Sequence, residues 1–254
     1  MTAIPLSRTV YYPESDGRPM AETQVHGQVM IDLIHALERR YADVPDVYVW
    51  GNMLLYYVEG DPRACVAPDL FLVKGVNKHV RRTYKIWEEG RAPSLVIEVT
   101  SKSTQTEDVQ AKKGVYERLG VDEYFLFDPL GEYLRPRLQG YRLADGQYQA
   151  LAPSVDGSLP SRETGLDLVP EGKRLRLRDA VSGEPLPWAD EEARRADQEA
   201  QRADEEARRA DREARRADEE ARRAEQEKLA REATEERLRA LETEMARLRG
   251  EPGR

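Results

Sequence analysis

The sequence predicts a mixed α/β (α+β) domain, with a core of order αβββαβ and extra β structure, followed by a long charged helix. Two observations support this prediction. Before about Pro187, some stretches have apolar residues at helical spacing and others have short β-branched runs, with Gly and Pro between them. After Trp188, the chain is almost entirely Ala, Arg, Glu and Asp and repeats every seven residues. The chain therefore combines a globular region with a helical appendage.

The composition narrows the classes of function. The 254 residues carry 40 Lys and Arg against 48 Asp and Glu, so the chain lacks the basic bias of a typical phosphate-binding protein. Any contact with DNA must then come from a local patch or through a cation. A single cysteine, Cys65, excludes a disulfide framework and a thiolate metal site within one chain. We find no signal peptide and no apolar stretch long enough for a membrane span, so we expect a cytoplasmic protein.

The globular region begins with a predicted helix and two strands. Residues 22–40 place their apolar side chains on one face, which is typical of a helix packed on a core. Val47–Trp50 and Met53–Val58 are β-rich runs on either side of Gly51-Asn52, a pair that predicts a hairpin turn.

The later part of the region alternates strands with one helix. Thr104 and Glu107 form a capping box for a helix that ends at Leu119, where Gly120 is suited to the C′ position. The β-branched and apolar composition of the neighbouring runs favours strands. These strands are expected at Asp69–Val73, Leu95–Thr100 and Glu123–Asp128, with additional β structure between residues 133 and 178.

The seven-residue repeat predicts a helix over residues 190–249. Between 193 and 224, alanines recur at alternating spacings of three and four residues, as the a and d positions of a coiled coil do. Asp204 precedes Arg208 by four residues, which supports a helix even in isolation. An all-alanine seam buries little area, so a coiled coil and a single charged helix both stay open. An apolar pattern resumes in a shifted register at Leu238, Leu241, Met245 and Leu248.

These patterns divide the chain into five segments. They are a lead-in at 1–20, the globular domain at 21–180, a linker at 181–189, the charged heptad helix at 190–249 and a flexible end at 250–254.

Three charged residues interrupt the apolar patterns of the globular region. Alternation puts Glu98 on a buried face of its strand, where an unpaired carboxylate is costly. Asp69 opens its strand directly after Pro68. Lys112 falls at the centre of the apolar face of its helix, whereas Lys113 points outward. Because this helix follows the Glu98 strand, a right-handed crossover packs it onto the sheet close to Glu98.

An Asp, a Glu and a Lys at one sheet edge suit metal-assisted hydrolysis. Two carboxylates can hold Mg²⁺ while water and phosphate complete its coordination. A nearby ammonium can orient the attacking hydroxide or neutralise developing charge. Each residue also has a purely structural interpretation, with Asp69 as a turn residue and Lys112 as a lysine whose amine reaches solvent.

Several segments together resemble a known family. They are Pro68-Asp69, VIEVTSKST from Val96 to Thr104, the D-x-x-x-K-x-x-x-Y spacing of Asp108, Lys112 and Tyr116, GVDEYFLFDP from Gly120 to Pro129, and AETQVHG near the N-terminus. With these motifs, the chain resembles the restriction endonucleases of the Uma-two type, within the PD-(D/E)XK nuclease superfamily. The resemblance covers about residues 10–180.

The resemblance implies a restriction-endonuclease-like fold and a metal-dependent endonuclease acting on DNA. It assigns Asp69 and Glu98 as ligands of Mg²⁺, for which Mn²⁺ is a substitute. The superfamily pattern has a lysine two residues after the glutamate, where this chain has Thr100. In this group the lysine looks as though it has moved to the following helix, which assigns the catalytic role to Lys112. Lys102 is the competing candidate.

Additional candidates surround these three residues. Glu22 is a possible third carboxylate, with His26 one turn later on the same helix face, although a solvated helix start is equally expected. Ser101 is a candidate phosphate donor, and Tyr116 is interpreted as a packing residue. A basic run between the Asp69 and Glu98 strands is a candidate phosphate-contact patch or a solvated loop. Its members are Lys74, Lys78, Arg81, Arg82 and Lys85.

Three functions compete at this point. The leading one is a phosphodiesterase acting on DNA. The second is a catalytically weak nuclease fold that binds nucleic acid or protein, which the departure at Thr100 keeps open. The third is an assembly module whose coiled-coil tail pairs subunits, and a homodimer through the domain or the tail would suit double-strand cutting.

Overall fold

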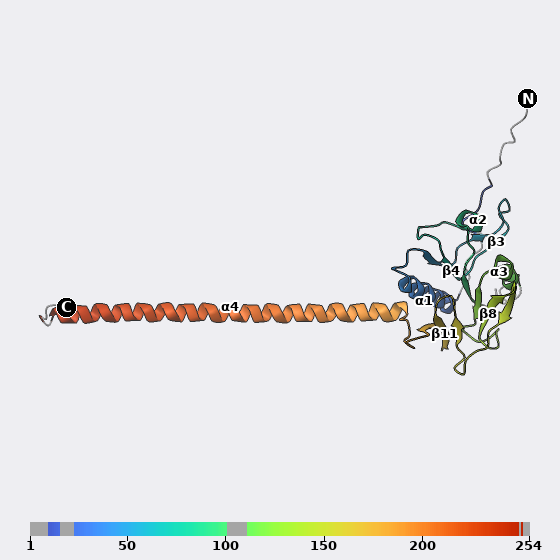
Figure 1. Cartoon of the computed structure of the whole chain (residues 1–254). Helices are drawn as coiled ribbons and strands as arrows, with labels where there is room; N and C mark the ends of the chain where they lie inside the picture. Colours follow the sequence, from blue (N-terminus) through green and yellow to red (C-terminus); the bar gives the residue numbers. More distant parts are fainter. Residues whose placement is uncertain (1–9, 16–22, 101–110, 249, 251–254) are drawn as a thin grey trace, which may run out of the picture. The chain divides into compact units, whose positions relative to one another are not determined.

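The computed structural model describes residues 10–15, 23–100, 111–248 and 250. It divides the chain into two compact units, one ending at Glu192 and one beginning at Ala193. The α/β class predicted from the sequence is confirmed (Figure 1). None of the helices in the described ranges combines the length and the apolar character that a membrane span requires.

A six-stranded sheet organises the first unit. Its strands lie in the order β1-β4-β6-β7-β8-β9, and β6 and β7 are parallel whereas the other neighbours are antiparallel. The parallel pair requires a crossover, which includes helix α3 (Lys113–Leu119). The strands are β1 (Val47–Trp50), β4 (Leu70–Lys74), β6 (Leu95–Val99), β7 (Glu123–Phe127), β8 (Leu138–Ala144) and β9 (Gln147–Ala150).

Both faces of this sheet are covered, which explains its continuous apolar runs. One face packs with helix α1 (Gln24–Arg40), where Leu33 and Leu37 share a core cluster with Leu70 and Ile97. The alternate strand residues belong to a second cluster that includes Tyr116 of α3. Because successive side chains of a strand point to opposite faces, α1 and α3 lie on opposite sides of the sheet.

Two small sheets flank the large one. The first contains β2 (Leu55–Tyr56), β3 (Cys65–Val66) and β5 (Tyr84–Lys85), and the short helix α2 (Ile86–Glu89) follows it. The second contains β10 (Leu159–Ser161), β11 (Leu166–Glu171) and β12 (Arg174–Asp179). The strands β8 to β12 confirm the additional β structure that the sequence predicts after residue 133.

The predicted hairpin around Gly51-Asn52 is wrong. β1 pairs with β4, whereas β2 belongs to the first small sheet. Asn52 does adopt a positive φ of 50°, and its amide donates to the carbonyl of Pro68 at 2.8 Å. A Cβ on Gly51 would lie 2.0 Å from the carbonyl oxygen of Asp69. The turn-forming pair therefore brings the end of β1 against the Pro68-Asp69 backbone instead of reversing the chain.

The ends of the two packing helices follow from local capping. The side chain of Thr23 accepts a hydrogen bond from the amide of His26 at 3.2 Å and caps α1. α3 ends at Gly120, whose φ of 75° is the left-handed conformation predicted for its C′ position. The capping box predicted at Thr104 and Glu107 lies outside the described residues.

One helix, α4 (Ala189–Leu248), is 60 residues long, and most of it belongs to the second unit. The predicted pair is present, because Arg208 lies 2.9 Å from Asp204. Gly250, with a φ of 72°, follows the helix end. The helix is therefore confirmed, and its pairing into a coiled coil stays a prediction. The apolar side chains of its last turns are exposed, namely Leu238, Leu241, Met245 and Leu248.

The start of α4 is tied to β12 by a network of charged and aromatic side chains. The guanidinium of Arg176 lies 3.2 Å from the ring centroid of Trp188, and it pairs with the Glu191 carboxylate at 2.7 Å. Arg174 pairs with buried Asp32 of α1 at 2.7 Å. The hydrogen bond from Arg176 is the main reason that the pKa of Glu191 falls from 4.5 to about 2, and the Trp188 amide adds to it.

We predict that Glu191→Gln lowers the free energy of unfolding at neutral pH by roughly 1 kcal/mol, the scale of a partly exposed charge-assisted pair. A depressed pKa stabilises the fold above the unfolded-state value and is lost as pH falls, here between about pH 5 and pH 2. Urea unfolding of the full chain at neutral and acidic pH measures the effect. Glu199→Gln, on the exposed part of the same helix, is the control, and an equal loss at both pH values would contradict the prediction.

Candidate active site

The two candidate carboxylates lie side by side at one end of the large sheet. β4 and β6 are antiparallel with Leu70 opposite Ile97, so the next pair in this register is Asp69 and Glu98. Neighbouring strands lie about 4.8 Å apart. Asp69 is the residue just before β4, so the pairing of Leu70 with Ile97 brings it close to Glu98.

Glu98 is 0% exposed, and its carboxylate is held by two side chains from the segment containing α3. The amine of Lys112 donates to Oε2 at 3.1 Å, and the hydroxyl of Tyr116 donates to Oε1 at 2.7 Å. Lys112 also donates to the carbonyl of Ala67 at 3.4 Å, beside the start of β4. A buried carboxylate is tolerated only with such donors, so this arrangement accounts for a charge inside the sheet.

Asp69 is held from the other side of the sheet. Its Oδ2 atom lies 3.2 Å from Nε2 of buried His26 on α1 and accepts the Val99 amide at 2.7 Å. Burial alone would raise the pKa of Asp69, but the hydrogen bond and charge of His26, the charge of Lys112 and the Val99 amide together hold this pKa below its ordinary value. Asp69 is therefore an anion at neutral pH.

Solvent reaches the side chains of Asp69, Glu98 and Lys112 to different extents. The side chains of Asp69 and Lys112 are 13% and 14% exposed, whereas Glu98 is fully buried. Solvent therefore reaches Asp69 and Lys112, whereas Glu98 is enclosed. We refer to Asp69, Glu98 and Lys112 as the carboxylate–lysine group.

The helical-wheel prediction for Lys112 agrees with its position, because its amine contacts Glu98. The prediction that Lys113 points outward misses a contact, since its amine lies 3.7 Å from the ring centroid of Tyr141. Thr100 occupies the position of the superfamily lysine, and its hydroxyl donates to the carbonyl of Phe127 at 3.3 Å. The Thr100 side chain therefore bonds back to β7.

Tyr116 is more than the packing residue that the sequence suggested. Its hydroxyl contacts the carboxylate of Glu98, while its ring packs with Tyr124 at a centroid distance of 5.2 Å. The signal was present in the spacing of Lys112 and Tyr116, since residues four apart share a helix face.

The remaining candidates fall into two groups. Glu22, Ser101 and Lys102 lie outside the described residues. In the basic run, four of the five members pair with carboxylates, and the amine of Lys78 donates to the backbone carbonyls of Tyr41 and Ala42. Phosphate contact by this run stays a prediction, and it would have to compete with these pairs. They are Lys74 with Glu163, Arg81 with Glu89, Arg82 with Glu14, and Lys85 with Glu88.

The donor set fits a hard divalent cation. Mg²⁺ keeps several waters and is commonly held by only one or two carboxylates. Asp69 and Glu98 supply two such groups at neighbouring register positions, and the charge of Asp69 is maintained at neutral pH. Within the described part of the chain, no three His, Cys, Asp or Glu side chains form a metal-holding cluster. A cation here would therefore depend on the two carboxylates together with water and substrate oxygens.

Comparison with known proteins identifies the family. The model of Uma2, described as a putative restriction endonuclease, matches residues 5–171. The chain belongs to this family. A crystal structure of a putative nuclease of DUF820 from Anabaena variabilis has a TM-score of 0.43 and 12% identity, over 56% of this chain and 75% of that chain. No curated protein matches the chain.

We predict that Tyr116→Phe destabilises the protein by about 1–3 kcal/mol, because it removes a donor to a buried carboxylate oxygen. Urea unfolding measures this change. Tyr141→Phe is the matched control, since the Tyr141 hydroxyl bonds to half-buried Gln139 at 3.2 Å and its loss should cost less. Equal stability of Tyr116→Phe and the wild type would show that the contact with Glu98 contributes nothing.

Proposed function

We propose that this protein is a metal-dependent endonuclease that hydrolyses phosphodiester bonds in DNA. The observation that carries the proposal is the buried Glu98 carboxylate, paired with Lys112 and adjacent in register to Asp69. Membership of a family that is described as a putative restriction endonuclease family supports a nucleic-acid substrate. The choice of DNA and a cytoplasmic location are parts of this proposal that rest on the sequence resemblance and on composition.

Asp69 and Glu98 would hold Mg²⁺, with Mn²⁺ as a substitute. The bound ion would supply positive charge that stabilises the phosphate and acidifies a water molecule. His26 would keep the Asp69 carboxylate in place for the ion through its contact with Oδ2. Tyr116 keeps Glu98 in place in the same way, through Oε1.

Lys112 is the group that we assign to the reacting water and phosphate. Its amine carries three donor hydrogens, and two of its contacts are Glu98 Oε2 and the Ala67 carbonyl. It reaches the surface beside Asp69. An ammonium in this place can orient the attacking water and neutralise charge that develops on the phosphate. A role for Lys102 is the alternative within the same mechanism.

The first test is cleavage of supercoiled and linear DNA with Mg²⁺ or Mn²⁺. We expect Glu98→Gln and Lys112→Ala each to lower the cleavage rate by about 10²–10³-fold, the effect of removing one preorganised charge-stabilising group. Lys113→Ala is the matched control, because this neighbouring lysine contacts Tyr141 instead. Circular dichroism establishes that the variants are folded.

The pattern of loss separates the alternatives. Loss with Glu98→Gln but not with Lys112→Ala would transfer the lysine role to Lys102. Unchanged cleavage in both variants would contradict the proposed site. No cleavage by the wild type, together with no metal binding in calorimetry, would favour a nuclease fold that only binds its partners.

That second function, a binding module assembled through its tail, is supported by the exposed apolar residues near the end of α4. Leu238 and Leu241 lie on one face at the spacing of a coiled-coil seam, and both are more than half exposed. This face is suited to a second copy of the chain, which would also bring two active sites together.

We predict that Leu238→Glu combined with Leu241→Glu converts a self-associating chain to a monomer in sedimentation. Charges in a paired seam are buried without partners, whereas on a single helix they are harmless. Leu229→Glu is the control, because Leu229 is exposed on the same helix but outside this seam. A wild-type chain that sediments as a monomer at all concentrations would contradict assembly through the tail.

A further inference from the structure

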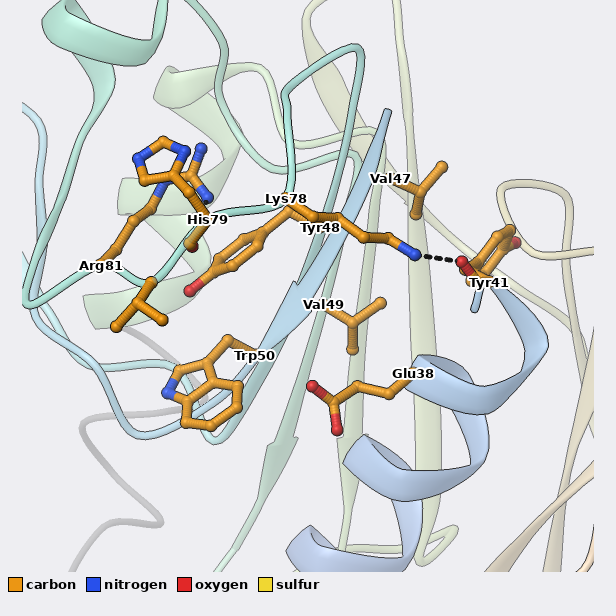
Figure 2. A pocket seen from close by; sticks show the side chains of 10 residues that line it. Glu38, Tyr41, Val47, Tyr48, Val49, Trp50, Lys78, His79 and Arg81 are labelled. Carbon is orange, nitrogen blue, oxygen red and sulfur yellow. Dashed lines mark hydrogen bonds between the residues drawn. The ribbon is translucent and has the colours of Figure 1, made fainter. Parts of the chain in front are cut away.

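A pocket lies along β1, the edge strand of the large sheet, and its volume is about 340 Å³. Figure 2 shows Trp50 and Glu38 at one end and the hydrogen bond between Lys78 and Tyr41 at the other, with Val49 between them. Its lining is mainly apolar, and both α1 and the segment that carries Lys78 contribute to it. The volume is within the range of pockets that bind small organic groups, about 300–1,000 Å³.

The Lys78 side chain closes the edge of β1 to an additional strand. Its amine donates to the carbonyls at the end of α1, those of Tyr41 and Ala42. A lysine across an edge strand is a common way to prevent strand addition. The position of this lysine disfavours the pairing of an extended peptide along β1, which argues against a peptide as the occupant.

The Trp50 end of the pocket lies toward the carboxylate–lysine group. Trp50 pairs with Phe71, two residues beyond Asp69 on β4. At about 3.3 Å per residue, Trp50 is displaced from Asp69 by roughly 7 Å along the strand. The following residue, Gly51, lies against the Asp69 backbone so closely that a side chain would not fit. A group bound on Trp50 would thus be the neighbour of a phosphate held at the carboxylate–lysine group.

The side chains at this end match a nucleobase. Trp50 is 43% exposed, and exposed aromatic rings stack on bases of any sequence. Glu38 is exposed and forms no ion pair with any residue in the described ranges. A carboxylate only accepts hydrogen bonds, so it favours bases with an amino donor, namely cytosine, adenine and guanine. The one donor of an unpaired thymine is its N3–H, which lies between two carbonyl oxygens that repel a carboxylate.

We propose that this pocket binds an unpaired nucleobase of the DNA substrate, stacked on Trp50 and hydrogen-bonded through its amino group to Glu38. The inference rests on the proposed function and refines its substrate class to DNA with a base displaced from the helix beside the phosphate to be cut. A base inside a duplex cannot reach a pocket, so it must turn out of the stack, which is easiest where it lacks a partner.

The test is binding of the full chain to short fluorescent duplexes by anisotropy, in EDTA so that no cleavage occurs. One duplex carries a single unpaired cytosine, the second an unpaired thymine, and the third is fully paired. We expect the wild type to bind the unpaired-cytosine duplex most tightly. Trp50→Ala should weaken this binding by about 10-fold, the scale of one lost base–aromatic stack, and leave the paired duplex unaffected.

Glu38→Ala should act differently, because it removes only the acceptor. We expect it to reduce the preference for cytosine over thymine by about 10-fold while the stacking contribution is retained. Trp87→Phe and Glu59→Ala are the matched controls, an aromatic and an acidic residue that do not line the pocket. Both should bind all three duplexes as the wild type does.

Three results would overturn the inference. They are equal wild-type affinity for paired and unpaired duplexes, unchanged binding by Trp50→Ala, and a Trp50→Ala effect on sedimentation alone, which would make the pocket a contact between copies.

Cleavage is measured separately with Mg²⁺. A wild type that prefers unpaired bases but cuts no DNA keeps the base site and rejects the nuclease. A wild type that cuts paired DNA and shows no preference for unpaired bases keeps the nuclease and rejects the base site.

Discussion

The buried carboxylate of Glu98 is the constraint on which the rest of this domain depends. A charge inside a sheet requires donors on the same face, and Lys112 and Tyr116 supply them from the segment that links β6 to β7. This requirement determines how the crossover must dock on the sheet. The same docking buries the Tyr116 ring in the second core cluster, so that charge compensation and apolar packing favour one position of α3. Asp69, held from the α1 side, completes an arrangement in which opposite faces of the sheet contribute to one edge.

Much of this arrangement could be predicted from the sequence because the pattern was local. The two-sided burial of β6 made Glu98 conspicuous, and the period of the following helix turned Lys112 toward it. The hairpin prediction failed for the opposite reason. Gly51 and Asn52 carry the residue types of a tight turn, but the close approach of Asp69, far along the chain, is what requires a glycine at position 51. No local signal distinguishes these two uses of the same dipeptide.

His26 and the basic run show a second limit, which concerns partners. His26 could be placed on the first helix but not joined to Asp69, because the two residues are distant in sequence and helix packing brings them together. The basic run suggested a phosphate surface, yet most of its charges meet acids from other elements. Charge counts along a chain describe only its composition. The net charge that a surface presents depends on which neighbours the charged side chains meet in the folded protein.

The contact between Lys112 and Glu98 has a further consequence, for the order in which the protein is assembled. In a site where carboxylates face each other and no Lys or Arg is present, the carboxylates repel each other. Such a protein folds only when a metal ion binds. In this protein the ammonium of Lys112 already balances the interior charge. We therefore expect the polypeptide to fold without a divalent ion, so that any ion at this site would bind to a scaffold that is already folded.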